Sequence, residues 1–166
     1  DSHIDLPIDI RSKADIFQQD LMPFKQLIAK GKVDALMPAH VIFPEVDSQA
    51  VGFSRYWLQN ILREQLGFNG VIFSDDLNMK GADILGSYSE RAVAAQRSGC
   101  DMVMLCNNRE GAVQALDGLP QTQVTILDSL LKKPTPEFNA LMQTREWKQA
   151  QQSISQLVDT WNNKNN

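Results

Sequence analysis

The sequence predicts an α/β protein built on a parallel sheet. Three short apolar runs, residues 33–37, 70–73 and 100–106, are nearly continuous, which is typical of strands buried on both faces. Amphipathic stretches separate them, so helices and strands alternate as in barrels and doubly wound sheets. Three strands are too few for a closed barrel and few for an open parallel sheet. The chain is therefore expected to be part of a larger fold.

Capping residues mark the helical region before the first apolar run. Ser12 and Asp15 have the spacing of a capping box, although Asp is a weaker partner than Glu at the third helical position. Pro23 is expected to open a second helix, because proline is favoured in the first helical turn, and Gly31 is expected to end it.

The helices between the apolar runs carry similar signals. Ser54 is the expected N-cap of a helix over residues 55–66, and Gly67 follows as its C′ residue. Ser89 is the expected N-cap of the next helix, which Gly99 ends.

The last part of the chain is predicted to be entirely helical. The expected helices cover residues 109–116, 124–133, 136–143 and 146–163, and the polar residues 162–166 are expected to fray. No repeat of fixed period and no low-complexity linker interrupts the sequence. Residues 1–166 are therefore expected to belong to one domain, with no separate second domain.

Composition excludes several classes of partner. Hydrophobic residues make up 43% of the chain and charged residues 22%, as in an ordinary globular domain. The net charge of −4 argues against nucleic acid as a partner, since phosphate binding requires a basic face. The apolar runs are far too short to span a membrane.

The cysteines and histidines do not predict a metal site. Cys100 and Cys106 lie within one apolar run, where buried, reduced thiols of a cytosolic protein are expected. With two cysteines and two histidines, widely separated, a zinc site is not expected.

Polar residues follow each predicted strand, at the edge where parallel α/β folds carry their chemistry. Asp75 stands out because residues 71–73 deliver it from an apolar run, and a carboxylate held there can act as nucleophile, base or metal ligand. The alternative is that Asp75 or Asp76 caps the next helix. Both readings are compatible, since one aspartate can cap while the other reacts.

Three further residues are candidates from position. His40 follows the first strand, where a hydrogen-bonded, half-buried histidine is the commoner interpretation, a direct catalytic role the minority case and a pocket-shaping role an alternative. His3 lies two residues from Asp1, and a carboxylate beside an imidazole orients it, although position alone favours a solvated terminal segment over an acid–base pair. Met79 is placed for packing or for lining a sugar-sized pocket.

Four stretches in fixed order resemble a known family. These are "DSHIDLPID", "MPAHVIFPEVD", "GFNGVIFSDDLNMKGA" and "SGCDMVMLCN". They are similar to the bacterial β-N-acetylglucosaminidases (β-hexosaminidases) of glycoside hydrolase family 3, in particular the cytoplasmic type that recycles peptidoglycan. The resemblance implies a single (β/α)8 TIM-type barrel, of which this chain would supply the last three strands with their helices.

The resemblance also implies roles for individual residues. It implies a retaining exo-glycosidase that removes terminal β-linked N-acetylglucosamine from anhydro-muropeptides, monomeric when complete and without a cofactor or metal. Asp75 would be the nucleophile, His3 the general acid/base, and Asp1 the group that orients and charges His3. Met79 and His40 would contribute to substrate binding. A neutral histidine base also makes phosphate a conceivable acceptor in place of water.

Two expectations concern the rest of the protein. The family's "KHFPGHG" segment and the first half of the barrel, with most sugar-binding residues, do not occur in this sequence. The chain alone is therefore expected to be inactive without its N-terminal half. The alternatives left open are a non-catalytic half-barrel that binds a sugar or a protein, and a metal-assisted α/β enzyme using Asp75 and Asp76, for which the sequence offers no third ligand.

Overall fold

The computed structural model describes residues 1–121, 124–131 and 137–164, and the chain divides into two compact units, Asp1–Leu130 and Leu131–Asn166. The ends of two predicted helices, at residues 132–133 and 136, lie outside the described residues, as do the last two residues of the segment expected to fray. Among the helices described, none combines the length and the apolar character needed to cross a membrane.

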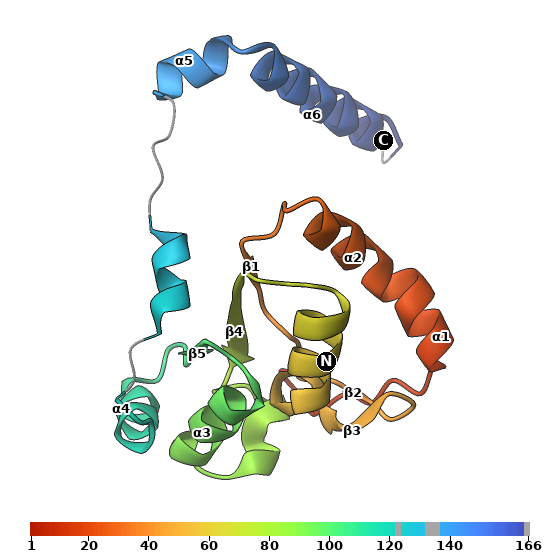
Figure 1. Ribbon diagram of the computed structural model, residues 1–166. Coiled ribbons are helices and arrows are strands. Elements are labelled where there is room, and N and C mark those ends of the chain that lie inside the picture. Colours follow the sequence, from red (N-terminus) through yellow and green to blue (C-terminus); the bar gives the residue numbers. More distant parts are fainter. Residues whose placement is uncertain (122–123, 132–136, 165–166) are drawn as a thin grey trace. The chain divides into compact units, whose positions relative to one another are not determined.

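The first unit is an α/β structure around a parallel sheet, which confirms the predicted fold class. The sheet has the order β1-β4-β5, with β1 at Ala35–Leu36, β4 at Val71–Asp76 and β5 at Met102–Met104 (Figure 1). Both neighbouring pairs are parallel, and all three predicted strands are present. Val71 and Ile72 in the central strand are fully buried, as expected for a strand covered on both faces.

The pairing of β4 with β5 is irregular just before the end of the sheet. The register shifts between Phe73 and Asp76, so more residues lie on β4 than on β5 over this interval. At this point the side chain of Ser74 takes the place of a backbone acceptor of β4. Its Oγ accepts a hydrogen bond from the Met104 amide of β5 at 2.8 Å. Such bulges re-aim side chains and are common beside functional sites.

A short antiparallel hairpin, which the sequence analysis missed, follows β1. It consists of β2 at Ile42–Phe43 and β3 at Asp47–Ala50. The amide of Ile42 donates to Pro7 O at 2.9 Å, and its carbonyl accepts from the Asp9 amide at 2.9 Å. The hairpin therefore holds the N-terminal segment beside the sheet. Strands this short lack the alternating pattern that would predict them.

The helical region before the sheet is continuous. It comprises α1 at Lys13–Asp15, a π-helical stretch η1 at Ile16–Asp20, and α2 at Leu21–Ala29. Ser12 is confirmed as the N-cap, since its Oγ accepts from the Asp15 amide at 3.1 Å. Gly31 is confirmed as the end, with a φ of 61° that favours glycine.

The prediction that Pro23 opens a second helix is wrong. Residues Asp20 and Leu21 keep helical backbone angles, so the chain enters α2 directly from η1. Pro23 is the third residue of α2, so this element begins two residues before the proline that was expected to open it.

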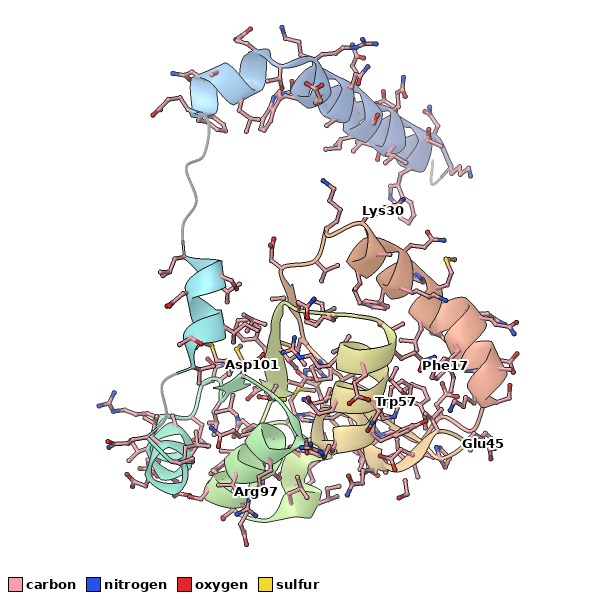
Figure 2. All side chains as sticks on the ribbon, in the orientation of Figure 1. Phe17, Lys30, Glu45, Trp57, Arg97 and Asp101 are labelled. Atoms are coloured by element: carbon pink, nitrogen blue, oxygen red, sulfur yellow. The ribbon has the colours of Figure 1, made fainter. Side chains whose placement is uncertain are left out.

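The helix after the hairpin begins and ends within one residue of the prediction. It is π-helical, η3 at Tyr56–Gln65, and is preceded by a single 3-10 turn, η2 at Val51–Phe53. Ser54 Oγ accepts from the Trp57 amide at 3.0 Å, which confirms it as the capping residue, and Gly67 ends the helix with a φ of 69°. Trp57 packs against Phe17 of η1, with ring centroids 5.9 Å apart (Figure 2).

The cap of the next helix was predicted two residues too late. Helix α3 covers Tyr88–Ser98, and its N-cap is Ser87, which forms a reciprocal capping box with Glu90. Ser89 instead donates to Gln114 O in the neighbouring helix. Ser87 has glutamate at its third following position, whereas Ser89 has an apolar residue there, so only Ser87 can form the box. Gly99 ends the helix as predicted.

The remaining helices confirm the helical character of the last part of the chain. In the first unit, a 3-10 helix η4 covers Lys80–Leu85, α4 covers Arg109–Gly118 and η5 covers Thr125–Leu130; α3 and α4 lie side by side (Figure 1). In the second unit, α5 covers Phe138–Gln143 and α6 covers Arg145–Lys164. An edge-to-face contact between Phe138 and Trp147, at 5.7 Å, joins α5 to α6.

A single ion pair organises the N-terminal edge of the sheet. Arg63 of η3 contacts Asp101 at 2.7 Å and also donates to the carbonyls of Phe68 and Gly70. Asp101, labelled in Figure 2, accepts from the Ile72 amide at 2.7 Å. Both charged side chains are less than 20% exposed, at 18% and 19%. The pair therefore joins η3, β4 and the start of β5.

Replacing Arg63 by methionine is expected to lower the free energy of unfolding by about 3 kcal/mol, because it leaves the Asp101 carboxylate without its counter-charge. Urea-induced unfolding followed by circular dichroism measures the change. Arg97→Met is the control, since Arg97 lies exposed on α3 (Figure 2), and its effect should stay within about 0.5 kcal/mol. Equal effects of the two substitutions would contradict the assigned role of Arg63.

Candidate active site

The carboxyl end of the central strand carries both candidate aspartates. Asp75 and Asp76 are the last residues of β4, so they lie within the strand and not after it. The two carboxylates have different hydrogen-bond partners, within the interval where the register of β4 against β5 shifts. Both side chains are partly buried.

Asp76 has a structural role. Its Oδ1 accepts from the amides of Asn78 and Cys106, both at 2.9 Å, which closes the turn after β4 and ties it to the end of β5. Its backbone carbonyl accepts from the Met79 amide at 3.1 Å and from His40 Nε2 at 3.1 Å. Neither aspartate caps the next helix, because η4 has Met79 at its N-cap position without a side-chain cap bond.

Asp75 is largely free for chemistry. Its Oδ1 accepts one hydrogen bond, from the Asp76 amide at 2.9 Å, which fixes the orientation of the carboxylate. Within the part of the chain that the structure describes, no protein group hydrogen-bonds to Oδ2. A carboxylate oriented through one oxygen and open at the other is the form that a nucleophile requires.

Asp1 and His3 form the pair that their spacing allows. His3 Nδ1 lies 2.9 Å from Asp1 Oδ1, and the His3 amide donates to the same oxygen at 3.0 Å. The amides of Ile4 and Asp5 close a turn onto the Asp1 carbonyl. Because Nδ1 faces the carboxylate, Nε2 is the ring nitrogen left to exchange a proton with a ligand. The two side chains remain 61% and 74% exposed.

The turn that carries His3 is docked against the loop that follows Asp75. Gly81, in η4, donates its amide to Ser2 O at 3.0 Å. A Cβ atom at Gly81 would lie 3.0 Å from His40 Cβ and 3.4 Å from Ser2 Cβ, so only glycine fits between the two without displacement. This close approach connects the Asp1–His3 turn, the end of β4 and the segment after β1.

His40 and Met79 differ in how deeply their side chains are buried. His40 is 1% exposed, its ring stacks on Phe53 at 5.1 Å, and its Nδ1 has no hydrogen-bond partner among the described residues. In this structure His40 supports the end of β4 from within the core. Met79 is partly buried at the start of η4. Direct contact of either residue with a substrate stays a prediction.

Arg91 anchors the loop between β4 and α3, and the sequence analysis missed it. Its guanidinium donates to Leu77 O and Gly86 O, both at 2.8 Å, and pairs with Asp83 at 2.9 Å. Lys80 also contacts Asp83 at 2.7 Å, and this hydrogen bond, with the charge of Arg91, lowers the pKa of the Asp83 carboxyl. An arginine four residues into a capped helix gives no pattern that predicts contacts to a preceding loop.

Both cysteines are free, and neither favours thiolate chemistry. Burial raises the pKa of Cys100 to about 12. The pKa of Cys106 is also raised, by desolvation first and then by the charge of Asp76. Across residues 1–121, 124–131 and 137–164, no three His, Cys, Asp or Glu side chains are grouped so that they could hold a metal ion.

The fold and the site together define an α/β protein with an aspartate at the carboxyl end of a parallel strand and an Asp–His turn docked on the loop that follows this strand. The family model described as "Glycosyl hydrolase family 3 N terminal domain" matches residues 1–132. The chain therefore belongs to glycosyl hydrolase family 3.

Relatives and solved structures agree with this assignment. The chain is 57% identical over 164 residues to a beta-hexosaminidase of Photobacterium profundum, covering 99% of this chain and 48% of the relative. It is 44% identical over 169 residues to a beta-hexosaminidase of Haemophilus influenzae, covering 97% and 48%. The crystal structure of NagZ from Neisseria gonorrhoeae in complex with N-trifluoroacetyl-D-glucosamine matches with a TM-score of 0.75 and 38% identity, over 95% of this chain and 46% of that one. The chain spans about half the length of these relatives.

Gly81→Ala is expected to displace the turn that carries His3, because the added methyl group would lie 3.0 Å from His40 Cβ. Displacements of about 1 Å can cost up to about 100-fold in rate, so the smaller shift expected here should lower kcat/KM of the complete protein by up to about 10-fold. Gly52→Ala is the control, since a Cβ there would lie no closer than 3.6 Å to its neighbours, which is an ordinary contact distance. Unchanged activity of Gly81→Ala would show that the docking of Ser2 does not matter.

Proposed function

We propose that the complete protein containing this chain is a retaining exo-glycosidase that removes terminal β-linked N-acetylglucosamine from anhydro-muropeptides during cell-wall recycling in the cytoplasm. One observation supports the chemistry: Asp75 has a carboxylate oxygen free of protein partners in the described part of the chain, and the loop that follows it is hydrogen-bonded, through Gly81, to the turn that holds the Asp–His pair. Relatives named beta-hexosaminidase support the reaction class. The muropeptide substrate follows from the resemblance of the sequence motifs.

The proposed first step forms a glycosyl–enzyme intermediate. The Asp75 carboxylate attacks the anomeric carbon, and the bond from this carbon to the leaving oxygen breaks. Protonated His3 gives its proton from Nε2 to that oxygen, so the leaving group departs as a neutral alcohol. Asp1 holds the ring through Nδ1 at 2.9 Å, which leaves Nε2 to face the leaving oxygen.

The proposed second step reverses these roles. Neutral His3 accepts a proton from water while the water oxygen attacks the anomeric carbon and the ester bond to Asp75 breaks. Two inversions at the same carbon give net retention. Retaining glycosidases commonly use two carboxyl groups, and here an imidazole takes the place of the second, because it can donate and accept a proton near neutral pH.

We also propose that catalysis requires the part of the protein outside this chain. The sheet has three strands, whereas a closed parallel barrel has eight, and the chain covers 48% of its Photobacterium profundum relative. The N-terminal half would therefore act as the partner that completes the sugar-binding pocket, within a protein that is monomeric when complete.

Asp75→Asn is expected to lower kcat of the complete protein by at least about 1,000-fold, because an amide cannot form the glycosyl ester. A fluorinated N-acetylglucosamine analogue should label the wild-type peptide that contains Asp75, as seen by mass spectrometry. Asp117→Asn, at an exposed position of α4, is the control and should remain active and labelled. A covalent adduct on another residue, or none, would contradict the assignment.

His3→Gln is expected to slow release of a sugar alcohol by about 100- to 10,000-fold, because this leaving oxygen needs a proton. Release of nitrophenolate, which departs without protonation, should be slowed much less in the first step. Pre-steady-state kinetics on the two N-acetylglucosaminides measure the difference. Equal slowing of both would contradict general acid catalysis by His3.

A further inference from the structure

A polar cluster at the rim of the site remains outside the roles assigned above. It consists of Asn78, Tyr88 and Asn108, which come from the turn after β4, the first residue of α3 and the N-cap of α4. Tyr88 Oη donates to Asn78 Oδ1 at 2.8 Å. Asn108 Nδ2 donates to Asn78 Oδ1 at 3.1 Å and to Tyr88 Oη at 2.9 Å. Three elements thus converge on one exposed asparagine.

The direction of these hydrogen bonds determines which way the side-chain amide of Asn78 faces. Asn108 Oδ1 accepts from the Gly111 amide at 2.9 Å, so its Nδ2 must face the cluster. Asn78 must then turn its side-chain oxygen toward Asn108 and Tyr88. Both of these residues donate to Asn78, and its NH2 group could not accept their hydrogen bonds. The Asn78 NH2 group therefore points away from the cluster, and it has no protein acceptor among the residues described.

Each member of the cluster is also held from its other side. The backbone amide of Asn78 donates to Asp76 Oδ1 at 2.9 Å, which fixes the backbone of Asn78. The guanidinium of Arg91 lies 4.8 Å from the centre of the Tyr88 ring. A Cβ at Gly111 would lie 2.9 Å from both the Tyr88 ring and Asn108 Nδ2, so this glycine permits the close packing. An exposed donor so firmly oriented is preorganised for binding.

We propose that Asn78 is a specificity-determining residue, whose side-chain NH2 donates a hydrogen bond to an acceptor oxygen on the leaving part of a saccharide substrate. Tyr88 and Asn108 are positioning residues that orient this donor. The inference rests on the proposed function, since it assumes that the sugar to be removed is held at Asp75. The acceptor is a hydroxyl, acetamido or carboxyl oxygen, all of which occur on saccharides.

The position of Asn78 favours the leaving part over the sugar that is removed. Asn78 lies three residues after Asp75, in the turn that Asp76 closes through its hydrogen bond to the Asn78 backbone amide. It is exposed, whereas Asp75 is partly buried. With the anomeric carbon at Asp75, groups that extend out to the rim belong to the part of the substrate that departs.

Asn78→Asp in the complete protein separates donation from positioning. An aspartate keeps the oxygen that accepts from Tyr88 and Asn108 but replaces the NH2 donor by a second oxygen. The measurement compares kcat/KM for a disaccharide with a saccharide leaving group and for the nitrophenyl glycoside of the same sugar. The kcat/KM for the disaccharide, divided by that for the nitrophenyl glycoside, should fall about tenfold, which is the effect of one hydrogen bond. Tyr88→Phe should lower the same ratio by a smaller factor.

The outcomes separate this inference from the proposed function. Asn69→Asp, an exposed position before β4, is the control and should leave both kcat/KM values unchanged. A proportional loss on both substrates, or no loss, in Asn78→Asp would mean that the cluster is only a structural link between α3 and α4, and would overturn the inference. A wild-type protein that hydrolyses neither substrate would overturn the proposed function, and the inference with it.

Discussion

The carboxyl edge of the sheet depends on the hydrogen bonds of one residue, Asp76. Its side chain joins the turn after β4 to the amide of Cys106 beyond β5, and its carbonyl accepts from the buried ring of His40 beyond β1. Three strand ends that are far apart in the sequence are thus held by a single residue. Buried or half-buried polar groups of this kind are costly unless they are satisfied, and this requirement restricts the edge to one arrangement.

The adjacent aspartate benefits from this arrangement. Because Asp76 satisfies the backbone amides of the turn, Asp75 needs only one hydrogen bond for its orientation and keeps an oxygen for a ligand. The two aspartates can divide structure and chemistry because the Asp76 carboxylate accepts from two backbone amides, whereas that of Asp75 accepts from one. The Asp1–His3 turn reaches the same edge through Gly81, where the absence of a side chain allows the approach to Ser2.

Prediction from sequence succeeded where the signal is local. The strand around residues 71–73, the Ser12 and Ser54 caps and the helix ends at Gly31, Gly67 and Gly99 follow from apolar runs, side-chain acceptors and positive φ angles. It failed at Pro23 and Ser89, where a neighbouring π-helical turn and a better-matched cap at Ser87 took precedence. In both cases the residues that decide where the helix begins lie within a few positions of the predicted start. Which of them prevails depends on hydrogen bonds that compete for the same backbone groups.

The sequence by itself determined the class of fold, the family and the candidates Asp75 and His3, because apolar periodicity and short motifs carry that information locally. Only the tertiary structure decided which aspartate is structural, that His40 is enclosed in the core, and that Asn78 presents a fixed donor at the rim. These properties arise from hydrogen bonds between residues that are distant in the chain, such as Asp76 with Cys106 and Asn78 with Asn108. The spacing of residues along the sequence does not reveal such contacts, because the partners come together only when the chain folds.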